Sequence, residues 1–191
     1  MKYLVGRTAG MSGLIAAIVA THIATMAGYW FGAVKLPAFG FNHLNGWIVF
    51  NFLRPPFDTF SNPTWIVFVV GGAVHYINGI LWGLIFALVI SPMMGRWSKR
   101  LAPMTPTNNY LKGVIWGWAL WIISSAVWMP LVAGSIPGIQ VGAFLTNFGK
   151  IGVQAVFTNF LWHTIYGVNL GLLFNPTSAA WAAEMGAPKA R

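Results

Sequence analysis

The chain contains no cysteine and only two acidic residues, Asp58 and Glu184. The absence of cysteine excludes disulfides, thiolate zinc sites, iron–sulfur clusters and thiol catalysis. Charged residues make up 7% of the 191 residues, whereas soluble globular proteins have about 25%. With so little polar surface and 57% hydrophobic residues, the composition excludes a water-soluble domain. It indicates an integral membrane protein surrounded by the lipid bilayer.

Nearly all of the charge is positive. The 11 lysines and arginines give a net charge of +9, but they are scattered along the chain. Nucleic-acid binding needs basic residues gathered on one face or along one helix. We therefore expect no nucleic-acid partner.

Four long apolar stretches predict an all-α, polytopic membrane fold with four transmembrane helices. A helix needs roughly 20 mostly apolar residues to cross the hydrocarbon core. The stretches cover about 8–34, 64–93, 110–133 and 147–174. The first is too long for the apolar region of a signal peptide, so we expect it to be retained. The spans predict a single membrane domain over residues 1–191.

The distribution of lysine and arginine predicts the orientation. Eight lie at the N-terminus, in the middle loop and in the C-terminal tail, and three lie in the other two loops. Because cytoplasmic loops are enriched in these residues, we predict a multi-pass protein of the cell (inner) membrane with both termini in the cytoplasm. The outer connection at about 35–63 carries many large apolar side chains. We predict that it lies in the membrane interface.

A repeated pattern relates the second and fourth spans. The sequence HxxxGxxxGxxF begins at His75 and recurs 88 residues later at His163. This repeat predicts two parallel helical hairpins, formed by spans 1–2 and 3–4. Glycines four residues apart occur in every span and allow helices to pack closely. Alternatively, some of these glycines make room for a flat cofactor.

Three histidines fall at similar depth in the predicted spans. His22, His75 and His163 lie 11 to 13 residues from the outer span ends, which is about 17–20 Å at the rise of an α-helix. Ionisable groups at this depth mark a candidate site. Each histidine can simply bond to a threonine, an asparagine or a backbone carbonyl of a neighbouring helix.

Ligation is the alternative role for these histidines. Neutral imidazole is the commonest metal ligand, and His75, His163 and His22 are candidate axial ligands of a haem or a (bacterio)chlorophyll-type tetrapyrrole. Three glycines one turn from a histidine would admit the ring: Gly71, Gly79 and Gly167. A three-histidine metal centre is a further possibility, but no carboxylate lies within the spans to support it.

Short motifs at the span ends carry a resemblance. These are Lys35-Leu36-Pro37, Arg54-Pro55-Pro56-Phe57 and Met129-Pro130-Leu131, with a histidine in the second span. The layout resembles the small four-helix bacterial inner-membrane protein families of unknown function. The resemblance covers most of the chain and implies an integral membrane protein without assigned chemistry.

The sequence favours a protein without catalytic activity of its own. The spans are rich in tryptophan and glycine and contain no mid-membrane carboxylate. We therefore expect a non-catalytic accessory or structural subunit of a larger integral membrane complex, of the respiratory or photosynthetic kind, with other membrane subunits as partners. Two alternatives remain open at this point. One is a haem- or pigment-binding electron-transfer protein that uses the midplane histidines, and the other is a small transporter or pore.

Overall fold

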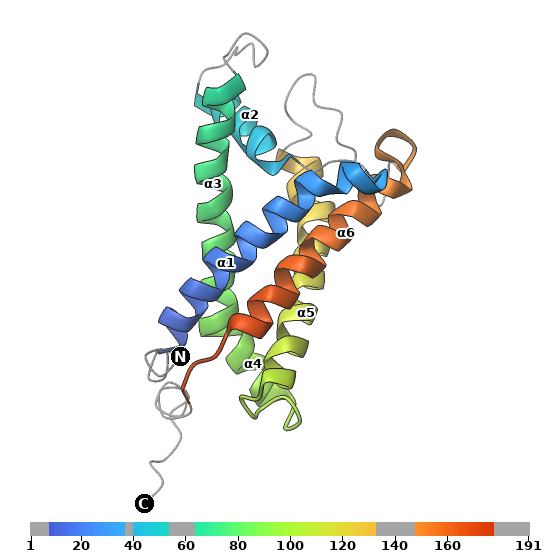
Figure 1. Cartoon of the computed structure of the whole chain (residues 1–191). Coiled ribbons are helices and arrows are strands. Elements are labelled where there is room, and N and C mark those ends of the chain that lie inside the picture. Colours follow the sequence, from blue (N-terminus) through green and yellow to red (C-terminus); the bar gives the residue numbers. More distant parts are fainter. Residues whose placement is uncertain (1–7, 37–39, 54–63, 133–147, 178–191) are drawn as a thin grey trace, which may run out of the picture. The chain divides into compact units, whose positions relative to one another are not determined.

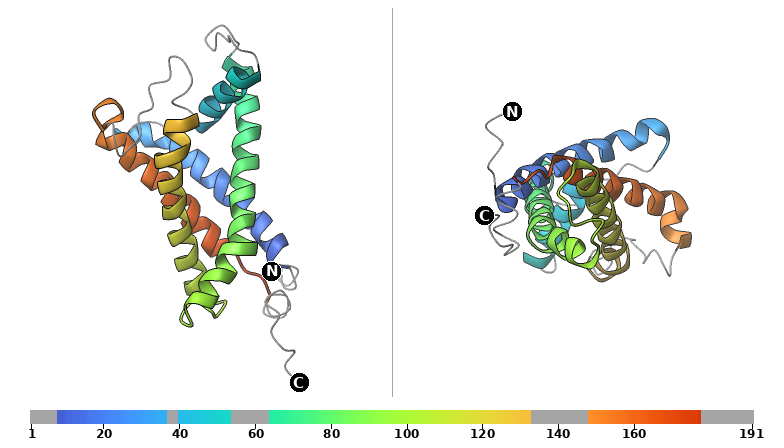
Figure 2. Two further views of the ribbon diagram at one scale, coloured as in Figure 1. Left: turned by 180° about the vertical axis from the view of Figure 1, so that it is seen from behind. Right: turned by 90° about the horizontal axis from the view of Figure 1, so that it is seen from below.

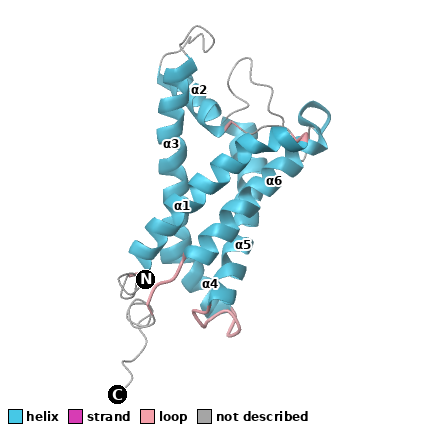
Figure 3. Cartoon of the chain, in the orientation of Figure 1, coloured by secondary structure: helices cyan, strands magenta, loops and turns pink. Residues whose placement is uncertain are grey.

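The computed structural model describes residues 8–36, 40–53, 64–132 and 148–177 (Figure 1). All regular secondary structure in these ranges is helical (Figure 3). The predicted all-α class is therefore confirmed for the described part of the chain.

The helices follow one another with few connecting residues. α1 covers Ala9–Trp30 and continues as a 3₁₀ turn, Phe31–Val34, and α2 covers Phe41–Leu53. α3 covers Thr64–Ile85 and runs through a π-helical stretch, Phe86–Ile90, into α4, Ser91–Trp97. α5 covers Pro106–Ile123, followed by a π-helical stretch, Ser124–Val132. α6 covers Phe148–Leu173.

Local sequence signals explain where two of these helices begin. The Thr8 hydroxyl accepts a hydrogen bond from the backbone N–H of Met11 at 3.2 Å, at the start of α1. The Thr105 hydroxyl accepts one from the N–H of Asn108, also at 3.2 Å, and Pro106 occupies the first position of α5. Both are N-terminal caps, which satisfy donors that the helix itself leaves without a partner.

Three helical stretches are long and apolar enough to cross a membrane: Ala9–Val34, Trp65–Trp97 and Pro106–Trp128. They correspond to the first three predicted spans and indicate a multi-pass membrane protein in contact with the bilayer. The fourth predicted span coincides with α6, which is long enough but is not among the three. Its sequence includes polar residues such as Gln154 and Asn159. The count of four spans therefore stays a prediction, as does the orientation.

Small residues form the buried face of α1. Its fully buried alanines recur at helical spacing: Ala9, Ala16, Ala17, Ala20 and Ala24. The exposed face carries large apolar side chains: Met11, Ile18, Val19, Ile23 and Met26. In lipid, association of helices depends on close backbone approach rather than on hydrophobic burial. This division of residue size is what a helix needs when it packs through one face and meets lipid with the other.

The chain divides into two compact units. The first consists of Met1–Ile23, Gly79–Gly117 and Thr164–Arg191, and the second of Ala24–Asn78 and Trp118–His163. α1, α3, α5 and α6 each contribute a segment to both units. The predicted pairing of the spans into two hairpins stays a prediction.

Glycines bring the helices of the first unit into backbone contact. A Cβ atom added at Gly113 of α5 would overlap the carbonyl oxygen of Gly167 on α6, and one added at Gly167 would overlap the carbonyl of Gly113. A Cβ at Gly83 of α3 would likewise overlap Ala17 of α1. These glycines have the close-packing role predicted from their spacing. Gly32, which the four-residue spacing pairs with Gly28 in the first span, differs, because no atom of a neighbouring residue lies within 4 Å of its Cβ position.

The second unit contains a comparable contact between α2 and α3. The two helices lie side by side in Figures 1 and 2. A Cβ at Gly46 would overlap the carbonyl oxygen of Val67, and one at Gly71 would overlap that of Asn42. The middle of the predicted interfacial segment is thus a helix packed on α3. Residues 37–39 and 54–63 of that segment lie outside the described residues, and its depth in the membrane stays a prediction.

Candidate functional site

His75 is held by three helices of the second unit. It lies on α3, and only 4% of its surface is exposed. Its Nε2 is 2.8 Å from the hydroxyl oxygen of Thr25 on α1. One face of the ring stacks on Phe41 of α2, with the ring centroids 5.4 Å apart and the planes 3° from parallel. The imidazole is therefore fixed at its edge by a hydrogen bond and at its face by a ring.

His163 lies on α6 in the same unit and is 6% exposed. Its Nδ1 is 2.9 Å from the backbone carbonyl oxygen of Asn159, one turn earlier. A carbonyl oxygen only accepts hydrogen bonds, so Nδ1 carries the proton and donates it. In the neutral ring the lone pair then lies on Nε2, which makes no hydrogen bond to a described residue. This arrangement is the one that metal-bound histidines usually have.

Two aromatic side chains join the histidines into one cluster. Trp162 lies 5.5 Å from His75 and 5.0 Å from His163, measured between ring centroids. Phe41 lies 4.7 Å from Trp162 and 6.5 Å from His163. We call Phe41, His75, Trp162 and His163 the histidine cluster. The structure brings together two of the three histidines that the sequence places at similar depth.

Buried amides border the histidine cluster. Asn159 donates a hydrogen bond from Nδ2 to the Ser125 hydroxyl at 2.9 Å, which links α6 to the segment that follows α5. The Oδ1 atoms of Asn159 and Asn42 are buried and have no hydrogen-bond partner among the described residues. Buried polar atoms are normally paired. The second unit, which contains the histidine cluster, therefore has two buried acceptor oxygens that can accept further hydrogen bonds.

His22, the third predicted ligand, has a different environment. It belongs to the segment of α1 in the first unit, and its side chain is exposed. Thr21 and Thr25, which lie one turn apart on the same helix, are buried. The predicted layer of three imidazoles stays a prediction with respect to His22.

The three glycines predicted to flank a tetrapyrrole are in contact with neighbouring helices. Gly71 meets the backbone of α2, as described above. Gly79 meets the Thr21 side chain, and its carbonyl accepts a hydrogen bond from the Tyr166 hydroxyl at 2.7 Å. Gly167 meets the backbone of α5. A flat ring placed against any of these glycines would have to displace a helix or a side chain, and their role as cofactor-binding residues stays a prediction.

The histidine cluster contains two residues that sequence reasoning missed, Phe41 and Trp162; Trp162 directly precedes His163 in the sequence. Phe41 lies in the outer connection, and no periodicity relates that segment to a histidine on another helix. Its aromatic character was the only available signal. No group of three or more histidine, cysteine, aspartate or glutamate side chains that could hold a metal ion is found in the part of the chain that the structure describes.

Comparisons with protein-family models, with curated proteins and with solved structures found no match. The resemblance to the small four-helix families stays a prediction.

Proposed function

We propose that this protein is a non-catalytic accessory subunit of a larger integral membrane complex, of the respiratory or photosynthetic kind. The observation that carries the proposal is a row of large apolar side chains on α5. Leu111, Ile115, Trp118 and Ile122 are all exposed. Their spacing of four, three and four residues puts them on one face of the helix.

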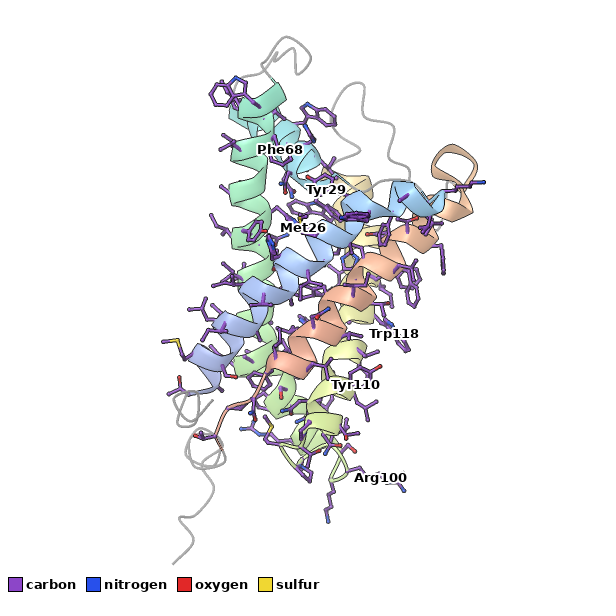
Figure 4. All side chains as sticks on the ribbon, in the orientation of Figure 1. Met26, Tyr29, Phe68, Arg100, Tyr110 and Trp118 are labelled. Atoms are coloured by element: carbon purple, nitrogen blue, oxygen red, sulfur yellow. The ribbon has the colours of Figure 1, made fainter. Side chains whose placement is uncertain are left out.

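Trp118 is the residue that distinguishes this row from an ordinary lipid-facing surface. It lies near the middle of the candidate span Pro106–Trp128 and is 44% exposed (Figure 4). Tryptophan facing lipid is enriched at the two membrane interfaces rather than at mid-span. The centroids of the Trp118 and Phe160 rings are 6.0 Å apart. This contact restrains one side of the indole. A large, pre-positioned aromatic side chain is typical of the residues that dominate protein interfaces.

The interior of the molecule supports the same proposal. Both buried histidines are engaged in contacts within the protein, His75 with Thr25 and His163 with Asn159. The first bond joins α1 to α3 and the second lies within α6. A hydrogen bond between helices stabilises a membrane bundle without providing chemistry. The exposed apolar row on α5 is therefore the feature that supports binding to another membrane protein.

Photo-crosslinking in living cells tests the proposal. A photoreactive residue placed at Trp118 or Ile122 is expected to form adducts with another membrane protein. The same residue at Ile77 of α3, which is also exposed and apolar, controls for random contact in the bilayer. If positions 118 and 122 give adducts with lipid alone, the proposal is wrong.

We infer further that the protein crosses the inner membrane four times, with both termini in the cytoplasm. α6 has 26 residues, or about 39 Å of helix, which exceeds the roughly 30 Å hydrocarbon core. Because the chain has no cysteine, single cysteines report sidedness without background. Ser135→Cys is expected to react with an impermeant maleimide in intact cells, and Ser178→Cys only after permeabilisation. Labelling of both from outside would contradict a fourth span.

A second function, a haem- or pigment-binding electron carrier, is favoured by the orientation of His163. Its Nδ1–H donates to the Asn159 carbonyl, and its Nε2 makes no hydrogen bond to a described residue, as an axial ligand requires. A bound haem would supply one-electron chemistry. Protein purified from native membranes is then expected to show a Soret band that His163→Ala and His75→Ala abolish and that His22→Ala preserves. A colourless preparation of the intact chain rejects this function.

A further inference from the structure

The turn between α4 and α5 gathers three cationic side chains. Arg96, Lys99 and Arg100 are exposed there, beside Trp97, which is 78% exposed. The chain's two acids lie outside the described residues, so no described carboxylate neutralises these charges. We call Arg96, Trp97, Lys99 and Arg100 the basic turn.

Hydrogen bonds fix the backbone of the basic turn. The side-chain amide of Asn108 donates to the carbonyl oxygens of Arg100 and Pro103, both at 2.9 Å. The carbonyl of Ser98 accepts from the N–H groups of Leu101 at 2.9 Å and Ala102 at 3.1 Å. The backbone carrying the three cations is therefore ordered by its own contacts, which lowers the entropic cost of binding a ligand there.

The basic turn lies between two candidate membrane spans. One span ends at Trp97 and the next begins at Pro106. Two consecutive spans put the residues between them on one side of the bilayer, and we expect residues next to a span end to lie at the depth of the lipid headgroups. The Arg100 side chain extends away from the ribbon at this turn (Figure 4). Tryptophan at the end of a span has the amphipathic character suited to this depth.

A further lysine contacts the connection that carries the basic turn. Lys112 of α5 is fully buried, and its Nζ is 3.6 Å from the sulfur of Met104. Met104 belongs to the same connection. The Lys112 side chain therefore joins α5 to the connection that carries the basic turn.

We propose that the basic turn binds the phosphate headgroup of an anionic phospholipid. Arginine presents parallel N–H groups that match two phosphate oxygens, and two arginines are available. The exposed indole of Trp97 packs along the glycerol region of the same lipid. An acidic protein segment is the less favoured ligand, because a turn at headgroup depth meets lipid phosphates first. The proposal is independent of the role as an accessory subunit.

Native mass spectrometry of the full-length protein in mild detergent tests the proposal. Phosphatidylglycerol and phosphatidylcholine are added at equal concentration, and the bound lipid is counted. The wild-type chain is expected to retain phosphatidylglycerol preferentially. Neutralising one cation, as in Arg100→Gln, should weaken retention about fivefold, and neutralising all three about 100-fold.

A matched variant controls for net charge. Lys35→Gln, Lys189→Gln and Arg191→Gln together remove the same three charges elsewhere, and retention is expected to stay within about twofold of wild type. Circular dichroism verifies that each variant keeps its helix content, and Arg100→Gln alone serves if the triple variant does not fold. Equal retention of the two lipids overturns the proposal. It is equally overturned by equal losses in the two triple variants, or by displacement of the lipid with inorganic phosphate or an acidic peptide.

Discussion

Substituting Gly167 by alanine tests whether helix contact through glycine stabilises the first unit. The added Cβ atom would overlap the carbonyl oxygen of Gly113 and lie 2.9 Å from the Cα of Gly117. Carbon atoms in contact prefer separations of about 3.5–4.0 Å, so α5 and α6 must separate by roughly 0.6–1.1 Å at this point. Overpacking of this kind costs about 1–3 kcal/mol, and the better helix propensity of alanine returns about 0.8–1 kcal/mol.

The net expectation is a loss of up to about 2 kcal/mol in the free energy of unfolding. Gly10→Ala is the matched control, since its Cβ would lie 3.8 Å from Leu88, an ordinary contact. That variant should be neutral or about 1 kcal/mol more stable. Unfolding by sodium dodecyl sulfate in mixed micelles, followed by circular dichroism, measures both. Equal stability of the two variants would refute the claim that backbone contact between α5 and α6 stabilises the protein.

Two hydrogen bonds between helices give the remaining stability predictions. Tyr166→Phe removes the bond to the Gly79 carbonyl and should cost about 0.6–1.7 kcal/mol, from the average to the maximum measured for such bonds in membranes; an unchanged micelle unfolding curve would show that this bond contributes nothing. Thr25→Val keeps the shape of the side chain but removes the partner of His75. It should cost a similar ~0.6–1.7 kcal/mol and shift the ¹⁵N resonance of the His75 Nε2 in spectra of histidine-labelled protein, and a resonance identical to that of wild type would contradict the contact.

Helix formation and the meeting of two of the three histidines were predictable from the sequence. A long apolar run in lipid must be helical, because each backbone N–H and C=O must be paired within the segment. The fixed rise per residue then converts a count from the span end into a depth. His75 and His163, which this count places at similar depth, both contact Trp162 in the structure. Their depth in the membrane stays a prediction.

The direction in which a side chain points around the helix was harder to predict. In α1 both faces are apolar, so hydrophobicity does not distinguish buried from exposed positions. His22 is exposed although it matches the other two histidines in predicted depth. The difference lies in residue size, since alanines occupy the buried face. Size, not polarity, is therefore the informative pattern for orienting a helix of this protein.

Contacts between segments that are distant in the chain could not be predicted from the sequence. The spacing of Gly71, Gly79 and Gly167 predicts close approach by some neighbour, but it does not say whether that neighbour is a ring or a helix. In the structure the neighbours are side chains and backbone of adjacent helices. The contact of Phe41 with His75 joins residues from two elements whose sequences contain no shared pattern.

We propose that this protein serves a larger membrane complex through the exposed apolar row on α5. Affinity purification of the intact, tagged chain from its native membranes in mild detergent tests it most directly. We expect defined membrane subunits to copurify with the wild-type chain and to be lost from Trp118→Ala, while Trp65→Ala, altered at the start of α3, retains them. Recovery of a monomer without companions, under conditions that keep other membrane complexes intact, would contradict the claim.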